Sequence, residues 1–205
     1  MNEFSENLQQ VKLWKVLIQR RSVLFGLITL FIIGFFAIFA PWISSIDPNS
    51  IAVRSRLLPP GSEYWLGTDE LGRDIFTRLI YAGRVSLMVG IGVAVISSCI
   101  GIIMGLTSGF FKHLDAPISR ITDAMMAFPD ILLAISLVAV LGGSVSNVVI
   151  ALSIVYAPRV ARIVRASTLV IRELPYVEAA KALGVGTPTI LFSHILRNIM
   201  SPIIV

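Results

Sequence analysis

Charged residues are scarce in this sequence. Asp, Glu, Lys and Arg make up 14% of its 205 residues, whereas soluble domains usually carry about 25%. The charges that are present lie between long apolar blocks, and hydrophobic residues make up 56% of the chain. This pattern excludes an ordinary soluble domain and predicts a protein that crosses the lipid bilayer several times.

Cysteine and histidine are nearly absent as well. The one cysteine, Cys99, lies inside an apolar block, and the two histidines, His113 and His194, are far apart in the sequence. A single cysteine forms no internal disulfide and no cysteine-type zinc site. We therefore expect no bound metal, and we interpret Cys99 as a small packing residue.

The sequence also lacks the motifs of nucleotide binding and of catalysis. There is no G-x-x-x-x-G-K-[ST] phosphate loop, and none of the four lysines follows a glycine. Neither an H-E-x-x-H pair nor a nucleophile with a paired base is present, so a membrane-embedded enzyme is disfavoured and no catalytic residue or cofactor is expected. The net charge of +5 does not form a basic face with interleaved aromatic residues, so nucleic-acid binding is disfavoured too.

Long apolar runs take the place of these features. Residues 22–46 carry no charge and are long enough to cross about 30 Å of hydrocarbon. No small-residue cleavage pattern closes this run, so we expect a retained first transmembrane helix rather than a signal peptide. Further spans are predicted at residues 85–111, 118–141 and 147–168.

The C-terminal apolar run, residues 199–205, is too short to cross the bilayer. A spanning helix that stopped midway would leave carbonyl groups unpaired in lipid. Either the chain is a fragment or its end folds back, and both interpretations are kept. The sequence thus predicts an all-α polytopic membrane helix bundle with four complete transmembrane helices and the start of a fifth.

Basic residues indicate which side of the membrane each segment faces. Residues 1–21 hold four basic residues, so the positive-inside rule places this N-terminal segment in the cytoplasm. The loop at residues 47–84 carries five basic and five acidic residues and is assigned to the extracytoplasmic side. Within it we expect a short helix that begins at residues 68–70 and runs through Arg78. The other 12 of the 17 basic residues fall on the cytoplasmic side: Lys12, Lys15, Arg20, Arg21, Lys112, Arg120, Arg159, Arg162, Arg165, Arg172, Lys181 and Arg197.

Small residues recur along the second predicted span. Gly101, Gly105 and Gly109 are spaced four apart, and Ser97 lies one step earlier. In a helix these positions share one face and allow a neighbouring helix to approach closely. We therefore expect residues 85–205 to form a packed transmembrane domain.

A short helix is predicted between the fourth span and the final apolar run, within residues 173–186. Pro175 suits the first turn of a helix, and Gly184 supplies a C-terminal stop. Ala179 and Ala180 leave a slim surface. A slim helix fits a groove on a partner protein, whereas an ordinary interfacial helix would lie on the bilayer, and composition leaves both interpretations open.

The same segment resembles a family motif. Glu178-Ala179-Ala180, with Gly184 after three further residues, is similar to the EAA loop of ABC-importer permeases. In that family the helix docks into a cleft of the ATP-binding subunit, so the resemblance implies a cytoplasmic coupling helix. Arg197 stands where the family usually has proline. The candidate coupling residues are Glu178, Ala179, Ala180, Lys181 and Gly184.

A second resemblance lies in the long loop. Residues 66–74 read Leu-Gly-Thr-Asp-Glu-Leu-Gly-Arg-Asp, and Arg-Val-Ser-Leu follows at residues 84–87. This is similar to the second permease subunit of dipeptide, oligopeptide and nickel importers, and the match extends from Trp14 to the end of the chain. Members of that family have six spans, so the chain looks truncated at its C-terminus. The candidate motif residues are Gly67, Thr68, Asp69, Gly72, Arg73 and Asp74.

These resemblances imply a permease subunit of an ATP-driven importer in the inner or plasma membrane of a prokaryote. The implied partners are two ATP-binding subunits, a second permease subunit and an extracytoplasmic solute-binding protein, and the partners rather than this chain bind ATP. Dipeptides, longer peptides and nickel all stay open as substrates. Residues 69–74 look closest to the peptide members, which favours peptides.

A secondary transporter or channel is the alternative function. Asp130 is the one acidic residue inside an apolar block, and it follows Phe128-Pro129, where a helix kink is possible. It could act as a proton relay. It could equally cap the helix after the proline or face a wet cavity.

Overall fold

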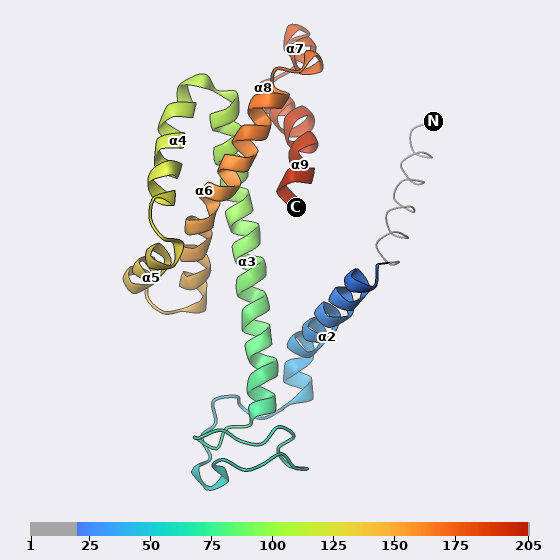
Figure 1. Ribbon diagram of the computed structural model, residues 1–205, viewed down its shortest axis with the longest axis vertical. Coiled ribbons are helices and arrows are strands. Elements are labelled where there is room, and N and C mark those ends of the chain that lie inside the picture. Colours follow the sequence, from blue (N-terminus) through green and yellow to red (C-terminus); the bar gives the residue numbers. More distant parts are fainter. Residues whose placement is uncertain (1–19, 205) are drawn as a thin grey trace. The chain divides into compact units, whose positions relative to one another are not determined.

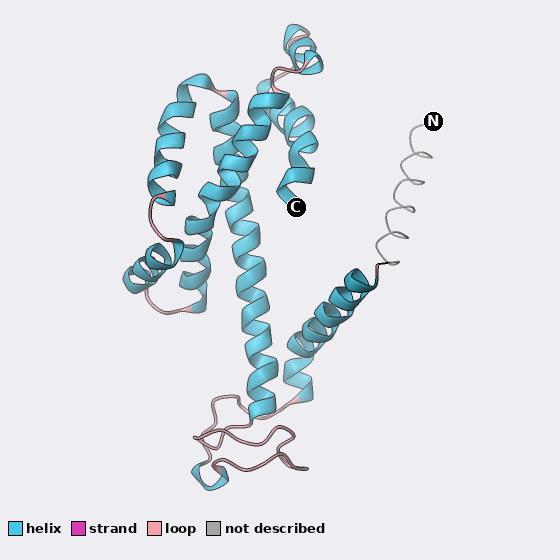
Figure 2. Ribbon diagram, viewed as in Figure 1, coloured by secondary structure: helices cyan, strands magenta, loops and turns pink. Residues whose placement is uncertain are grey.

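The computed structural model describes residues 20–204, and the regular structure in this range is helical (Figures 1 and 2). The range contains no β-strand, and one isolated bridge joins Thr68 to Asp74. The predicted all-α polytopic bundle is confirmed. The predicted N-terminal segment, residues 1–21, lies outside the described residues as far as position 19. The chain divides into two compact units, Met1–Met88 and Val89–Val205.

Three helices in the described part of the chain are long and apolar enough to cross a membrane, and a bent pair of helices makes a fourth span if it counts as one. The three are α2 (Arg21–Ile43), α3 (Ile75–Phe110) and α6 (Val145–Ile171). Helices α2 and α6 lie within a few residues of the predicted spans 22–46 and 147–168. The apolar runs therefore locate these helices well.

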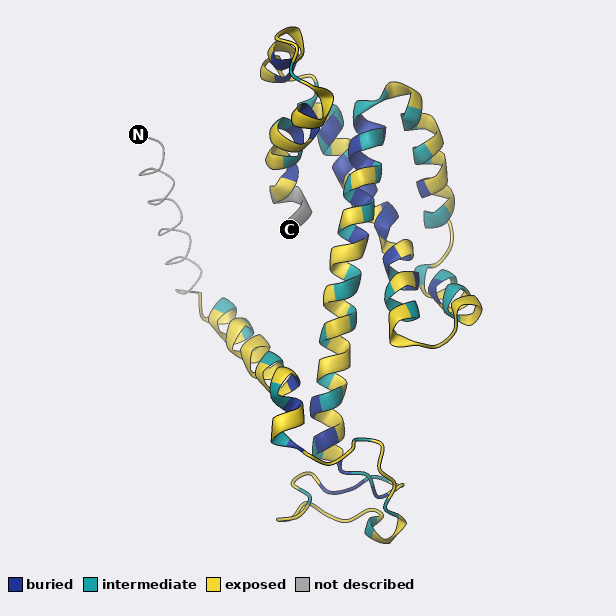
Figure 3. Ribbon diagram, turned by 180° about the vertical axis from the view of Figure 1, so that it is seen from behind, coloured by how far each residue is buried: buried dark blue, intermediate teal, exposed yellow. Residues whose placement is uncertain are grey.

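Helix α2, in the first unit, is apolar on every side. Its mean hydropathy reaches 2.8, and only 11% of the most apolar window is buried. Phe25 and Phe31 are both more than two-thirds exposed, and Figure 3 shows exposed residues along most of the helix. A helix with this composition needs lipid or other protein around it.

Helix α3 begins earlier than the predicted second span, residues 85–111. The expected short helix from residues 68–70 through Arg78 is not a separate element, because α3 runs without a break from Ile75 to Phe110. Residues before Asp74 belong instead to a loop that includes the short helix η1 (Val53–Ser55). No proline or glycine pair separates Ile75 from the apolar run, so the helix that starts in the loop continues into the span.

In the second unit, the predicted third span, residues 118–141, is two helices rather than one. Helices α4 (Lys112–Met126) and α5 (Asp130–Leu141) meet at a bend of 94°. Pro129 precedes α5 and has no backbone N–H to continue the α4 ladder, and it also disfavours helical backbone at Phe128. The pair is therefore a broken span or a re-entrant loop.

Helix α6 is packed against α3, α4 and α5, and Figure 3 shows buried residues gathered where α6 passes α3. A Cβ atom built at Gly101 or at Gly105 would lie 2.5 Å from the Cβ atom of Val160 or of Val164. At Gly109 it would lie 2.6 Å from the Cβ atom of Thr168. The glycine stripe therefore lies directly against α6, and α6 could not approach this closely if α3 carried side chains there.

The chain after α6 forms α7 (Pro175–Ala182) and then a continuous helical stretch. This stretch comprises α8 (Thr187–Thr189), the π-helical segment η2 (Ile190–Leu196) and α9 (Arg197–Ile204). We call these three elements the C-terminal helix. It passes without a break through Arg197, the position at which the motif it resembles usually has proline.

Candidate functional site

Helix α7, which carries the EAA-like sequence, has a well-defined end. Gly184 has a φ of +76°. Its N–H donates to the carbonyl of Lys181, and the N–H of Val185 donates to the carbonyl of Ala180, each at 3.0 Å. This is the Schellman arrangement, which satisfies carbonyls that would otherwise lack partners. Glycine adopts a positive φ such as this one at a lower cost than any other residue.

One face of α7 is attached to the second unit. Val177 is fully buried, and Ala180 is 7% exposed. Both belong to an apolar cluster at which α7 meets three other elements of the second unit. The other buried members come from α3, α6 and the C-terminal helix: Leu106, Val164, Ile190, Leu191, Ile195 and Ile199.

The other face of α7 is open. Glu178, Ala179 and Ala182 are exposed, and Leu183, directly after the helix, is 83% exposed. The small side chains leave the helix backbone accessible on this face, and Leu183 adds an exposed apolar side chain. Lys181 is exposed as well, but its side chain contacts the protein itself, because its Nζ atom lies 5.1 Å from the ring centroid of Phe110.

The two motif glycines of the long loop are required by its backbone. Gly67 and Gly72 have φ values of +76° and +75°. A Cβ atom at Gly67 would collide with the carbonyl of Leu58, and one at Gly72 would collide with the carbonyl of Ala52. Both glycines therefore allow segments of the loop to pack closely together. They serve the structure of the loop rather than form a binding surface.

Thr68 and Asp69 are hydrogen-bonded inside the loop. The hydroxyl of Thr68 accepts from the N–H of Leu58 at 2.8 Å. The carboxylate of Asp69 accepts from the N–H groups of Leu71 and Arg73 at 2.9 and 3.0 Å. It also accepts from Nε of Arg73 at 2.8 Å and pairs with Arg78.

These contacts set the charge state of Asp69. Partial desolvation alone would raise the pKa of its carboxyl, but the N–H groups of Arg73 and Leu71 and the Arg73 guanidinium outweigh it. The pKa of Asp69 is therefore held well below its usual range. The group is a permanent carboxylate at neutral pH.

Asp74 caps α3. Its carboxylate accepts from the N–H of Thr77 at 3.0 Å and from the Thr77 hydroxyl at 2.5 Å. The Thr77 hydroxyl also lies 2.6 Å from that of Ser44, just after α2. The loop motif therefore builds the junction between α2 and α3, and its polar side chains are used by the fold.

Three ion pairs connect α6 to the bent pair, and sequence reasoning missed them. Arg159 pairs with Asp130, and Arg162 pairs with Asp123 at 2.6 Å. Arg165 binds Asp115 through two nitrogens, at 2.5 and 2.8 Å. We call these contacts the Arg–Asp ladder. Arginines three apart in an apolar helix require counter-charges nearby, so their spacing in the sequence could have predicted such ion pairs.

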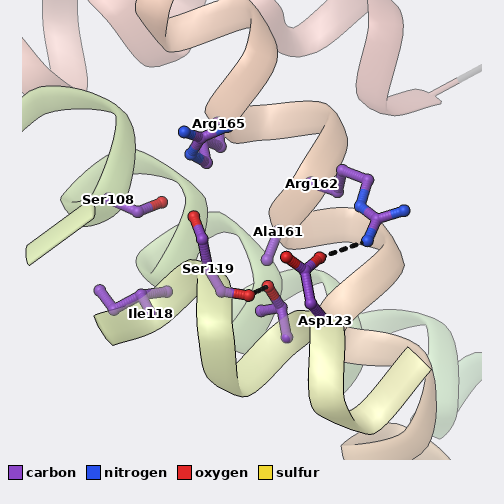
Figure 4. A pocket seen from close by; sticks show the side chains of 8 residues that line it. Ser108, Ile118, Ser119, Asp123, Ala161, Arg162 and Arg165 are labelled. Carbon is purple, nitrogen blue, oxygen red and sulfur yellow. Dashed lines mark hydrogen bonds and ion pairs between the residues drawn. The ribbon is translucent and has the colours of Figure 1, made fainter. Parts of the chain in front are cut away.

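A cavity of about 180 Å³ lies beside two rungs of the ladder. Figure 4 shows Asp123 of α4 directed toward Arg162 of α6, with Ser119 and Arg165 nearby. No buried side-chain nitrogen or oxygen in the described range lacks a hydrogen-bond partner. Of the lining residues, Asp123 and Arg162 are exposed and pair with each other.

Asp130, the candidate proton relay, belongs to the ladder. It lies in the first turn of α5, and its carboxylate accepts from the Arg159 guanidinium. The ion pair with Arg159 therefore commits this carboxylate to a contact between α5 and α6. The geometry gives no support to a relay at this position.

Sequence comparisons match a segment of each unit to a family of transport proteins. Residues 97–205 match the binding-protein-dependent transport system inner membrane component. Residues 9–60 match the N-terminal transmembrane domain of oligopeptide transport permease C. The first match alone covers more than half of the chain.

Individual relatives agree with these matches. A putative peptide transport system permease protein of Brucella suis is 47% identical over 189 residues, which are 92% of this chain and 64% of the relative. A dipeptide transport system permease protein of Alkalihalophilus pseudofirmus is 42% identical over 94% of this chain and 64% of its own length. A glutathione transport system permease protein of Pectobacterium atrosepticum is 41% identical over 91% and 62%.

The chain spans just under two-thirds of the length of these relatives. Within that span the similarity covers the loop motif, the glycine stripe and α7. The chain therefore belongs to the family of binding-protein-dependent transport system inner membrane components.

Proposed function

We propose that the chain is a permease subunit of an ATP-driven importer and that α7 is its coupling helix. The observation that carries the proposal is the two-sided geometry of α7. Its inner face, Val177 and Ala180, is buried in a cluster shared by α3, α6 and the C-terminal helix. Its outer face is small and exposed. When a partner docks on the outer face and moves α7, the three helices that pack against the inner face move with it.

The partners in this proposal are two ATP-binding subunits, a second permease subunit and an extracytoplasmic solute-binding protein. The ATP-binding subunits dock on α7 and supply the energy, so ATP is bound by them and this chain needs no cofactor of its own. The N-terminus then faces the cytoplasm, the same side as α7. Family membership supports this assembly.

The proposed substrate is a di- or oligopeptide. The relatives named above are described as permeases for peptides, dipeptides and glutathione, which is itself a peptide. Their shared substrate class supports a peptide rather than nickel.

Ala179→Trp tests the docking role. The indole would project from the exposed face of α7 and block close approach, while the buried face is untouched. We expect the tagged variant to insert in the membrane normally but to lose its ATP-binding subunits on purification in mild detergent, together with peptide uptake.

Ala116→Trp is the matched control, because Ala116 is exposed on α4 and lies away from α7 in the sequence. It should retain both partners and uptake. If Ala179→Trp retained them too, α7 would not be the docking helix.

A further inference from the structure

We infer that Arg172 and Lys181 are positioning residues that fasten the two ends of the α7 segment to the end of α3. This inference rests on the proposed function, because it concerns how movement of α7 reaches the transmembrane helices. Lys181 is one of the candidate coupling residues of the EAA-like segment and Arg172 is not, but that pattern gives neither residue a contact with α3. Both make contacts that apolar packing does not require.

Arg172 caps α3. It follows the last residue of α6, and its NH1 atom donates to the carbonyl of Gly109 at 2.7 Å. The last carbonyls of a helix have no partner within it, and a cation there also complements the helix dipole. The Arg172 side chain is only 16% exposed, so this contact is partly shielded from water.

The glycine stripe makes this contact possible. Gly109 lies against Thr168 so closely that an added Cβ atom would come within 2.6 Å of it. The ends of α3 and α6 are therefore near enough for Arg172 to reach across. A side chain at position 109 would separate them.

Lys181 makes the second contact at the same place. It lies in the last turn of α7, and its ammonium is over the ring of Phe110, the final residue of α3. A cation over an aromatic face is stabilised by the ring quadrupole. Arg172, which precedes α7 in the chain, thus contacts Gly109. Lys181, in the last turn of α7, contacts Phe110, the next residue of α3.

The chain path makes these contacts important. Between Phe110 and Pro175 the backbone passes through α4, α5 and α6, so no short covalent link joins α3 to α7. The remaining connection is the apolar cluster, and apolar attraction has no directional preference. Two directed contacts hold the end of α3 to α7 when a partner displaces it.

The test is binding-protein control of ATP hydrolysis in the assembled transporter. The complex is purified with its ATP-binding subunits and placed in lipid nanodiscs. Hydrolysis is measured with and without the extracytoplasmic binding protein, isolated from the native cells with the solute it carries. We expect Arg172→Gln plus Lys181→Gln to keep the subunits together but to lower the stimulation ratio several-fold.

Three further variants separate positioning from general stability. Lys112→Gln removes a charge at an exposed site next to the end of α3 and should leave the ratio unchanged. Lys181→Arg should retain stimulation, because a guanidinium also binds aromatic faces. Lys181→Gln should have no additional effect in a Phe110→Leu background, since the ring is already missing.

Unchanged stimulation in the double Gln variant would overturn the inference. Loss of the ATP-binding subunits from that variant alone would also overturn it, because the residues would then serve assembly. A wild-type chain that purifies without ATP-binding subunits would instead refute the proposed function itself.

Discussion

Two aspartates of the loop motif have different structural roles although they are five positions apart. Asp69 pairs with Arg73 of the loop and with Arg78 in the first turn of α3, whereas Asp74 satisfies N–H groups at the start of α3. The sequence predicted a helix that begins at residues 68–70, whereas α3 begins at Ile75. The difference arises because Gly67 and Gly72, which have positive φ values, hold the earlier segment in a turn.

Acid is expected to loosen this loop through Asp69. Its folded-state pKa lies below the unfolded value of about 4, so its contribution to stability is complete above that pH and is lost as pH falls through the folded pKa. Hydrogen exchange of the backbone between residues 44 and 74 should therefore stay slow at pH 4 and accelerate only in stronger acid. Asp69→Asn should exchange faster at neutral pH and lose this dependence.

Glu70→Gln is the control for that experiment, because Glu70 is the adjacent exposed carboxylate. It should leave the exchange profile as in the wild type. An Asp69→Asn profile with the wild-type pH dependence would show that another group controls the loop.

At the scale of elements, α3 offers two glycines that should respond oppositely to the same change. In Gly105→Ala the new methyl would lie 2.5 Å from Cβ of Val164 and 2.6 Å from the carbonyl oxygen of Ala161. Forcing the helices apart should cost about 1–3 kcal/mol. Gly90 has nothing within 4 Å of the same position, so Gly90→Ala should be neutral or stabilising by up to about 1 kcal/mol.

Thermal denaturation of both variants in detergent measures the difference. A lower midpoint for Gly105→Ala alone supports the close approach of α3 and α6. Equal midpoints would mean that the two helices are further apart than described.

The Arg–Asp ladder predicts a charge-swap rescue. Asp130→Arg would place two guanidiniums together at the start of α5 and should lower the yield of folded protein. Adding Arg159→Asp restores opposite charges and should recover most of the loss. Asp130→Asn should change the free energy of unfolding by less than about 1 kcal/mol, because both side chains are partly exposed.

Chromatographic yield and thermal midpoint in detergent read out this series. A double variant no better than the worse single one would argue against direct pairing. Proton-coupled uptake that disappeared in Asp130→Asn would revive the relay interpretation.

The sequence predicted helices better than the contacts between them. Apolar runs located α2 and α6, and Pro175 and Gly184 bounded α7, because these signals are local. A kink at Phe128-Pro129 was considered possible, but a single span was predicted across it, since the flanking apolar residues alone are consistent with one span. The ladder was missed because Asp115 and Arg165 are 50 positions apart and only tertiary structure joins them.

At the scale of the whole molecule, the proposed orientation can be tested directly. In a Cys99→Ser background, Ser62→Cys and Thr187→Cys each provide one exposed thiol. An impermeant maleimide added to intact cells should label position 62 and not position 187, because the positive-inside rule places them on opposite sides. Permeabilised cells should show labelling at both. The reverse pattern in intact cells would invert the topology.

The π-helical segment of the C-terminal helix gives the chain a place where its length can vary. Ile190 and Ile195 are five residues apart, yet both are almost completely buried. Hydrogen bonds from i to i+5 bring such positions to the same side, and α-helical bonds do so for positions four apart. Loss of one residue here would keep both isoleucines inside, whereas the same loss in the middle of α6 would rotate its buried side outward. Descendants of this gene could therefore tolerate a one-codon deletion at this point of the helix.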